Sequence, residues 1–295
     1  MHTADEHDLG LLHDLEVMRN RRLAAVRRLN RRAALRVLGA AGAGMVLVAC
    51  GGDRHDEGNA TEMTDGESTP TGGAASASTT EAAAAAGSSA QRAPTETAGP
   101  FPADGTNGPN VLVDAAVLRS DLTKSFGQYS GTASGVPLTV RLKVVRAGSG
   151  AAYAGAALYL WHCDAAGRYS LYSEGATDQN YCRGVQRADG AGAMTFKTVF
   201  PGCYAGRWPH FHYEVFPSLS ALSAANRQLT SQIALPENAC AAVYRDDDAY
   251  PDSARNLQGV SLQTDGVFRD SYQSQLGAVT GSAPSGYTMT YTVVV

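Results

Sequence analysis

The segment 137–145 alternates apolar and polar side chains with a period of two, which is typical of a half-buried β-strand. Further strand candidates lie at 156–161, 194–200, 210–216 and 288–295, with turn signals such as Ala-Gly-Ser-Gly and Pro-Gly between them. No segment carries a long 3.6-residue apolar period with caps, and one short helix is expected within 218–229. Many short strands between turns predict an all-β fold, a single β-sandwich domain with long loops.

The sandwich cannot include the whole chain of 295 residues. Residues 51–98 contain no Leu, Ile, Val, Phe, Trp or Tyr and consist largely of Ala, Gly, Ser, Thr and Glu. Such a segment cannot bury enough apolar surface to offset the entropy lost on ordering. We therefore expect residues 51–98 to be a disordered linker and residues 99–295 to form the folded domain.

Residues 1–50 resemble an export leader. Arg31-Arg32 precede an apolar stretch over 37–49 that is too short to span a bilayer and suits a signal peptide. The stretch ends in Leu-Val-Ala-Cys50, which resembles a bacterial lipobox, and the paired arginines resemble a twin-arginine signal. These features predict an exported lipoprotein tethered to the cell membrane through a lipidated Cys50. A buried Ala-rich helix is the alternative, and twin-arginine and general secretory export both stay open.

Cysteine usage fits export. Cys163, Cys182, Cys203 and Cys240 follow Cys50, and an even number of cysteines in an exported domain suggests two disulfides with three possible pairings. Four buried thiols are the alternative.

Charge excludes one class of partner. Acidic and basic residues nearly balance over residues 100–295, and no basic stripe occurs there. Nucleic acid is therefore not an expected partner.

Histidine is scarce in the domain and is concentrated in one motif. Besides His162, the only histidines after residue 98 are those of His210-Phe211-His212. Residues i and i+2 of a strand point to the same face, so both imidazoles of the motif can reach one metal ion. Two solvated histidines on a strand face are the alternative, and for His162 a structural role is favoured.

Two tyrosines accompany the histidine pair. Tyr204 follows a Pro-Gly turn six residues before His210, and Tyr169 follows the strand candidate that ends near Trp161. A phenolate is a hard, strongly donating anion, and a phenol with a pKa near 10 needs a strong Lewis acid to stay deprotonated at neutral pH. Ferric iron meets this requirement better than zinc, which prefers Cys, His and carboxylate ligands. Tyr213 should point away from His212.

The motifs around these residues resemble the intradiol ring-cleavage dioxygenases, a family that includes catechol 1,2- and protocatechuate 3,4-dioxygenases. The resemblance rests on Trp-His-Cys-Asp-Ala-Ala-Gly-Arg-Tyr over 161–169 and on Phe-Pro-Gly-Cys-Tyr-Ala-Gly-Arg-Trp-Pro-His-Phe-His over 200–212. Thr-Ala-Gly-Pro-Phe at 97–101 and Ser-Gln-Ile at 231–233 extend it to essentially 97–295. The secreted, single-domain branch is the most similar. No long helical dimerisation segment precedes the domain, so the oligomeric state stays open.

The resemblance implies a site and a reaction. Tyr169, Tyr204, His210 and His212 would bind a non-haem Fe(III), and Tyr204 would leave the iron when a catechol binds. Arg207 would stabilise negative charge that builds on the substrate ring, and Gln232 would lie near iron and substrate. The implied reaction cleaves the ring of a catechol with O2, between the two hydroxylated carbons, to a cis,cis-muconic acid. Loop residues around 101–135 and 170–182 would set the preferred ring substituents.

Two other functions compete with this one. A non-catalytic, membrane-tethered β-sandwich could bind a glycan or a protein, in which case Tyr169 and Tyr204 should lie far apart and no iron should bind. An iron-binding relative that has lost turnover is the other alternative.

Overall fold

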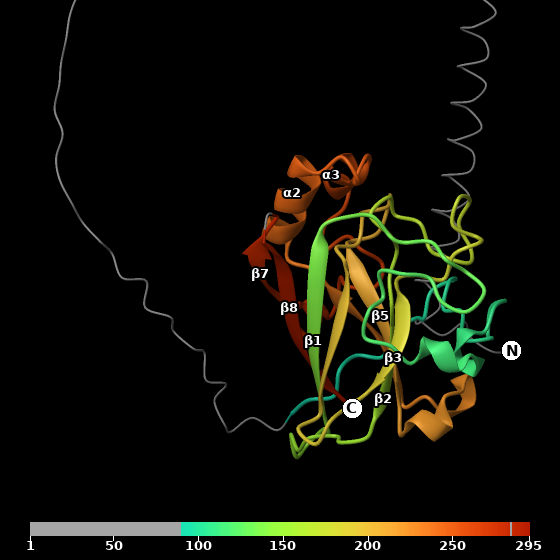
Figure 1. Cartoon of the computed structure of the whole chain (residues 1–295). Helices are drawn as coiled ribbons and strands as arrows, with labels where there is room; N and C mark the ends of the chain where they lie inside the picture. Colours follow the sequence, from blue (N-terminus) through green and yellow to red (C-terminus); the bar gives the residue numbers. More distant parts are fainter. Residues whose placement is uncertain (1–89, 284) are drawn as a thin grey trace, which may run out of the picture. The chain divides into compact units, whose positions relative to one another are not determined.

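The computed structural model describes residues 90–283 and 285–295, and within them eight strands form two four-stranded sheets (Figure 1). The strands are β1 (Pro137–Val145), β2 (Ala157–Trp161), β3 (Arg183–Arg187), β4 (Ala193–Val199), β5 (His210–Phe216), β6 (Leu229–Ala234), β7 (Ala278–Ser282) and β8 (Gly286–Val294). The sheet orders are β4-β1-β8-β7 and β3-β2-β5-β6. The predicted all-β sandwich is confirmed. The expected leader and most of the expected linker lie outside the described residues.

Strand β1 shows why the alternating segment folds as it does. Its inward side chains, among them Leu138, Val140 and Leu142, are buried in the core between the sheets, whereas the residues between them are exposed or half-buried. The strand pairs antiparallel with β4 and parallel with β8, so it lies in the interior of its sheet. One face of this sheet is therefore core and the other is open, as an alternating sequence requires.

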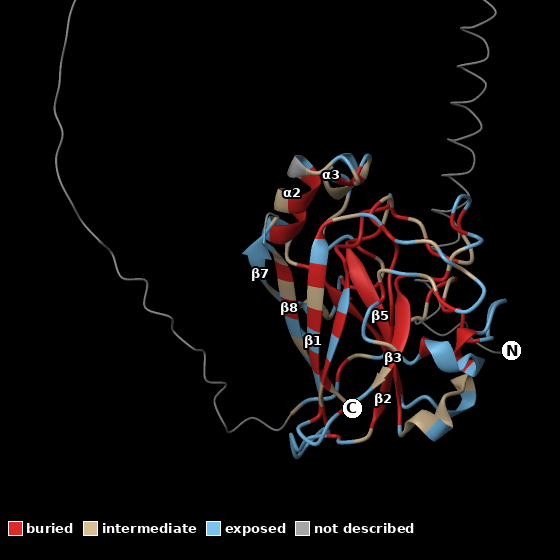
Figure 2. Cartoon of the chain, viewed as in Figure 1, coloured by how far each residue is buried: buried red, intermediate tan, exposed pale blue. Residues whose placement is uncertain are grey.

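Strands β2 and β5 are buried on both faces (Figure 2). One face packs into the core between the sheets through side chains such as Leu160, Phe211 and Tyr213. The opposite face carries Tyr159 and Trp161 and is covered by the long loops that precede β1. Burial on both faces removes the alternation from these strands. The covered face is where the candidate site lies.

Three α-helices follow the second sheet in the described chain: α2 (Glu237–Asp246), α3 (Ser253–Leu257) and α4 (Tyr272–Gln275). Short 3-10 helices η2 (Val111–Val113) and η3 (Ala115–Val117) lie in the loop before β1. The helix expected within 218–229 is instead two separate 3-10 turns, η4 (Leu219–Ala221) and η5 (Ala224–Asn226), whose N-caps lack a side-chain hydrogen bond. Among the described residues, no helix is both long and apolar enough to cross a membrane.

Residues 92–98 form a strap along the sheet edges, and the expected linker therefore ends earlier than residue 98. The backbone N–H of Ala93 donates to Val294 O at 3.0 Å, and that of Glu96 donates to Thr230 O at 2.8 Å. Ala93 is buried in the core between the sheets. Backbone pairing of this kind fixes a segment that has few apolar side chains of its own.

The two expected disulfides are wrong. All four cysteines after residue 98 are buried in the described structure, and no disulfide joins any two of them. Cys163 Sγ lies 3.3 Å from Gly202 O, and the Cys203 Sγ lies 3.5 Å from Arg207 O. A buried cysteine behaves as a small apolar side chain with a weak S–H donor. These cysteines accordingly pack in the interior, and the thiols of Cys163 and Cys203 lie close to backbone carbonyls.

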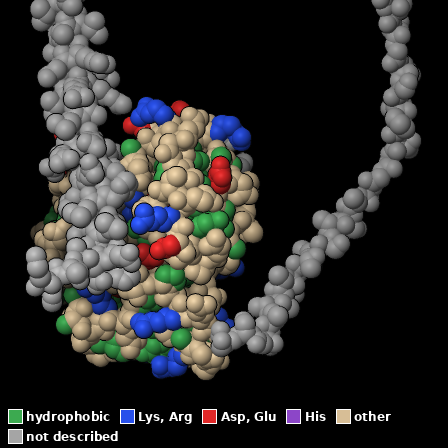
Figure 3. All heavy atoms as spheres, turned by 180° about the vertical axis from the view of Figure 1, so that it is seen from behind, with side chains coloured by type: hydrophobic (Ala, Val, Ile, Leu, Met, Phe, Trp, Pro, Cys, Tyr) green, Lys and Arg blue, Asp and Glu red, His purple; other side chains and the backbone are tan. Residues whose placement is uncertain are grey.

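Charged side chains are mixed by sign on the face opposite to that of Figure 1. On the visible part of that face, separate Lys and Arg side chains and a few Asp and Glu side chains lie among neutral groups (Figure 3).

Candidate metal centre

Four side chains named from the sequence converge at one point on the covered face of the second sheet. Tyr169 Oη lies 3.1 Å from His212 Nε2 and 3.3 Å from His210 Nε2. The two Nε2 atoms are 3.1 Å apart, and Tyr204 Oη lies 3.5 Å from His210 Nε2. Four ligand-type atoms, each about 3 Å from the next, are spaced as donors around one ion with bonds of about 2 Å.

The backbone explains how each tyrosine reaches the histidines. His210 and His212 begin β5 and share a face, whereas Tyr204 comes from the loop that follows β4. A Cβ on Gly202 would lie 2.2 Å from Ala165 O, so a glycine is required where this loop crosses the loop that leads to Tyr169. The close crossing brings the two phenol rings to 5.9 Å between centroids. The tethered binding module required these tyrosines to lie far apart, which this contact contradicts.

Both imidazoles are prepared to act as neutral ligands. The Nδ1–H of His210 donates to the carbonyl of Trp208, which leaves its Nε2 lone pair directed at the cluster. Burial, reinforced by the charge of Arg207, lowers the pKa of His210 to about 3. Burial and the neighbouring His210 also lower the pKa of His212 well below its usual value. Metals bind the neutral imidazole, so the site selects the form that a metal needs.

Aromatic rings fix the ligands in place. The indole of Trp161 stacks on the His212 ring with centroids 5.0 Å apart and an interplanar angle of 6°. Phe101 packs against Tyr169 at 4.9 Å between centroids. Trp161, His212 and Gln232 are register partners across β2, β5 and β6, so they form one row on the covered face. Packing on both sides restricts the ligand rotamers before any ion arrives.

The donor set fits a hard, strongly Lewis-acidic metal. The ligand atoms are two phenol oxygens and two imidazole nitrogens, and all four residues are 2% to 4% exposed. In the described part of the chain, no cluster of three or more His, Cys, Asp or Glu could hold a metal. A metal held by this cluster would have two phenol oxygens among its ligands, which suits ferric iron better than zinc.

Arg207 and Gln232 lie together beside the cluster. Arg207 is fully buried, and its Nη2 donates to Gln232 Oε1 at 2.6 Å. Gln232 Nε2 in turn donates to the carbonyl of Thr97 in the strap at 2.9 Å. The charge of Arg207 contributes to the low pKa of both ligand histidines, which places its guanidinium within electrostatic reach of the cluster. The structure thus brings together all six residues that the sequence names as the site.

Other candidates from the motifs have different partners. His162 Nδ1 lies 2.8 Å from Cys163 O, its Nε2 lies 2.7 Å from Thr198 Oγ1, and burial lowers its pKa to about 3. Tyr181 donates to Asp164 Oδ2 at 3.1 Å. Tyr213 lies in the core between the sheets, on the face opposite to the cluster. These residues therefore shape the fold around the site.

Arg183 is a buried clamp between two segments of the site. Its Nη1 donates to Phe101 O at 2.8 Å, and its Nη2 donates to Ser170 O at 2.9 Å. These hydrogen bonds join the segment that carries Phe101 to the loop that carries Tyr169.

The sequence missed three contacts at the site. Asp265 pairs with Arg207, the Trp208 carbonyl accepts from His210, and the Trp161 ring stacks on His212. Asp265 lies far along the chain in a loop with no motif around it. Trp161 and Trp208 lie inside the motifs quoted above. Their position next to the candidate ligands and their large aromatic side chains were the only features that could have indicated these contacts.

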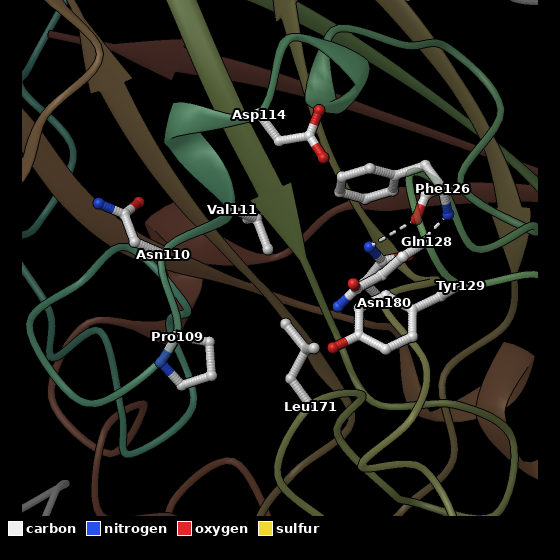
Figure 4. A pocket seen from close by; sticks show the side chains of 9 residues that line it. All are labelled: Pro109, Asn110, Val111, Asp114, Phe126, Gln128, Tyr129, Leu171 and Asn180. Atoms are coloured by element: carbon white, nitrogen blue, oxygen red, sulfur yellow. Dashed lines mark hydrogen bonds between the residues drawn. The ribbon is translucent and has the colours of Figure 1, made fainter.

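A cavity of about 300 Å³ lies near the loops expected to contact ring substituents. Asn110 and Pro109 line one side of it, and Phe126 and Tyr129 line the other (Figure 4). Leu171, two residues after Tyr169, projects into it with a positive φ of 71°. A non-glycine residue in this backbone conformation is uncommon and is often found near functional sites. Residues from both expected loops, 101–135 and 170–182, thus meet around one hollow.

The fold and the cluster together define an all-β domain in which two tyrosines and two histidines converge on one point. Residues 107–237, less than half of the chain, match a family model described as Dioxygenase. The domain is similar to an intradiol ring-cleavage dioxygenase from Tetranychus urticae, with 21% identity, 65% of this chain and 90% of that chain covered, and a TM-score of 0.51. The domain is also similar to the crystal structure of another dioxygenase, with 20% identity, 70% of this chain and 94% of that chain covered, and a TM-score of 0.54. No curated protein matches the sequence.

The resemblance to the intradiol ring-cleavage dioxygenases is therefore confirmed, by the family model over residues 107–237 and by the fold of the solved structures. The roles of individual residues remain predictions.

Proposed function

We propose that this protein is a non-haem Fe(III) intradiol dioxygenase. It would cleave catechol-type diols with O2, between the two hydroxylated carbons, to cis,cis-muconic acids. The observation that carries the proposal is the convergence of four donor atoms. Tyr169 Oη and the Nε2 atoms of His210 and His212 lie within 3.1 to 3.3 Å of one another, and Tyr204 Oη lies 3.5 Å from His210 Nε2. Arg207 and Gln232 beside this cluster support it.

Ferric iron is the metal that we assign to the four ligands. When bound, it would chelate the two catechol oxygens and draw electron density from the ring, which makes the ring reactive towards O2. The chain supplies two anionic oxygen donors and two neutral imidazoles for this ion. The same residues leave no carboxylate in the ligand set, which distinguishes the site from the His2-carboxylate sites of ferrous oxygenases.

Tyr204 is the ligand that we expect to exchange with substrate. It lies 3.5 Å from the nearest ligand nitrogen, His210 Nε2, whereas Tyr169 Oη lies closer to both histidines. A phenolate that leaves the metal is a base, so Tyr204 Oη can take up a proton from one catechol hydroxyl. Tyr169 would remain as the fixed phenolate, held by Phe101 against its ring.

Arg207 supplies the positive charge of the site. Negative charge builds on the substrate ring as it reacts, and a buried, oriented guanidinium stabilises such charge more than water can. Gln232 holds the Nη2 end of Arg207 and is itself held by the strap. The burial of all these groups keeps water away from the reacting ring.

The proposal is tested with the full chain loaded with iron. We expect a visible phenolate-to-iron band, a shift of that band on anaerobic addition of catechol, and aerobic conversion of catechol or protocatechuate to a muconate with uptake of one O2 per ring. His212→Gln should lose iron and activity, and Tyr213→Phe, on the opposite face of the same strand, should keep both. An iron-loaded protein that consumes neither O2 nor any catechol in a broad panel would refute the proposal.

We also propose that the enzyme acts outside the cytoplasm as a membrane-tethered lipoprotein. The support is sequence alone: Arg31-Arg32, the short apolar stretch and Cys50. The proposed reaction needs no cytoplasmic reductant, which is compatible with such a location. Cys50→Ala should release the protein from the membrane fraction, and unchanged fractionation would contradict the tether.

A further inference from the structure

Asp265 forms a buried ion pair with Arg207. The distance from Arg207 Nε to Asp265 Oδ2 is 2.9 Å, and both side chains are fully buried. Removing two charges from water is costly, and a buried pair is often no more stabilising than an apolar pair of similar size. The pair therefore needs another explanation than stability.

The carboxylate of Asp265 is itself fixed by the backbone. Its Oδ2 also accepts from the N–H of Trp208 at 2.7 Å, and its Oδ1 accepts from the N–H groups of Val267 at 2.8 Å and Phe268 at 3.2 Å. Burial alone would raise the pKa of Asp265, but Arg207 and the Trp208 N–H hold it below its usual value. Both oxygens are thus engaged, and the ionised carboxylate has one orientation.

Arg207 is held at two points of its planar guanidinium. Asp265 holds Nε, and Gln232 Oε1 accepts from Nη2 at 2.6 Å. Two anchors on a rigid planar group fix its plane as well as its position.

One residue, Trp208, links this ion pair to the proposed metal ligands. The N–H of Trp208 donates to Asp265, and the carbonyl of Trp208 accepts from Nδ1 of His210. Asp265 is thus connected to the segment that delivers both Arg207 and His210. A carboxylate 58 residues after Arg207 in the sequence sets the geometry of the chain just before β5.

We propose that Asp265 is a positioning residue that holds the guanidinium of Arg207 in a fixed orientation towards the substrate ring. It does not touch the substrate and acts through Arg207. A charge oriented before the reaction needs no reorganisation when negative charge develops, which is the basis of electrostatic preorganisation. The inference rests on the proposed function.

The test compares Asp265→Asn, Arg207→Gln and the double variant in the full, iron-loaded chain. In Asp265→Asn the negative charge is lost and only one acceptor oxygen remains. The amide N–H2 must then face N–H donors, either those of Arg207 and Trp208 or those of Val267 and Phe268, so the guanidinium is held less firmly. Because Arg207 acts on charge that builds during the reaction, kcat should fall and KM should change little. We expect a loss in kcat of about 10- to 100-fold for Asp265→Asn, and of about 100- to 1,000-fold for Arg207→Gln.

The double variant separates positioning from a merely structural role. If Asp265 acts through Arg207, adding Asp265→Asn to Arg207→Gln should lower kcat by less than about 2-fold further. The iron content and the anaerobic catechol-induced band should stay as in the wild type in the Asp265→Asn variant. Asp104→Asn is the control, because the buried carboxylate of Asp104 pairs with the partly exposed Arg227 at 3.0 Å, and this variant should leave kcat unchanged.

Three results would overturn the inference while the proposed function stands. They are a wild-type kcat in Asp265→Asn, an equal fall in kcat when Asp265→Asn is added to the wild type and to Arg207→Gln, or loss of iron from Asp265→Asn. A wild type that turns over no catechol would overturn both. Should Asp265→Asn fail to fold, Asp265→Glu keeps the charge but moves the carboxylate by one methylene. We then expect a reduced kcat with wild-type iron content, and a kcat equal to that of the wild type would refute positioning.

Discussion

Tyr169→Phe removes the one oxygen that contacts both histidines of the cluster while it preserves the shape of the ring. Tyr169 Oη lies 3.1 Å from His212 Nε2 and 3.3 Å from His210 Nε2, and the ring packs on Phe101 at 4.9 Å between centroids. The packing survives in phenylalanine, so the change isolates the donor atom. We expect metal affinity and stability to respond very differently.

The magnitudes follow from what is lost. In the metal-free protein the hydroxyl contributes hydrogen bonds of about 1 kcal/mol, offset by the cost of burying it, so the free energy of unfolding should change by about 1 kcal/mol or less. Changes to groups that only support a ligand already lower metal affinity about 10- to 100-fold. Loss of a ligand atom itself should exceed that, so iron affinity should fall by at least about 100-fold, or about 2.7 kcal/mol.

The assay measures iron per chain, the visible spectrum and urea unfolding with and without iron. Tyr169→Phe should unfold near the wild-type midpoint without metal, yet gain little stability when iron is added and lose most of the phenolate band. Tyr213→Phe is the control, because its ring lies in the core between the sheets. A Tyr169→Phe protein with wild-type iron content and colour would refute the assignment of this cluster as the metal centre.

Three further predictions follow. Tyr204→Phe should retain more iron than Tyr169→Phe but lose turnover, because Tyr204 Oη lies 3.5 Å from His210 Nε2 and is the expected proton acceptor. Iron content and kcat are measured for both variants. Equal losses of iron and of kcat in the two variants would contradict this prediction. Burial, and to a lesser extent the charge of Asp270, raises the pKa of Glu96 from 4.5 to about 7. The protonated carboxyl therefore contributes to the free energy of unfolding below about pH 4.5, and this contribution is lost as the pH rises through 7. We expect this loss to be about 1–2 kcal/mol, a value reduced for the partial exposure of Glu96, and Glu96→Gln should abolish it. Urea unfolding at about pH 5 and pH 8 measures it, and an unchanged pH dependence in the variant would argue against this assignment. Thiol titration in denaturant should detect Cys163, Cys182, Cys203 and Cys240 without prior reduction, and thiols that appear only after reduction would restore the disulfides.

The strands with one open face could be found from sequence, but other elements could not. Strand β1 alternates because its two faces meet different environments, and this is the signal that alternation reports. Helix α2 was missed because its N-cap is Pro236 without a side-chain bond, and because its ten residues give only a short buried face, made of Ala239, Cys240, Val243 and Tyr244. Strand β7 was missed because it is an edge strand that is mostly exposed and contains Gly281.

The ligand set could be named from sequence because its members lie in short local motifs, with His210 and His212 two apart on one strand. Asp265 could not, because no spacing rule relates it to Arg207; only the tertiary fold brings that loop under the guanidinium. The disulfides were wrong for a related reason, since an even count of cysteines says nothing about where their side chains pack.

The chain has two tryptophans, Trp161 and Trp208, and both border the ligand histidines. Trp161 stacks on His212, and the carbonyl of Trp208 accepts from His210. All indole emission of the folded protein therefore originates beside the cluster, with no background from elsewhere in the sequence. A ferric ion or a coloured catechol complex at this place would quench that emission, so the protein carries a built-in optical reporter of its own occupancy.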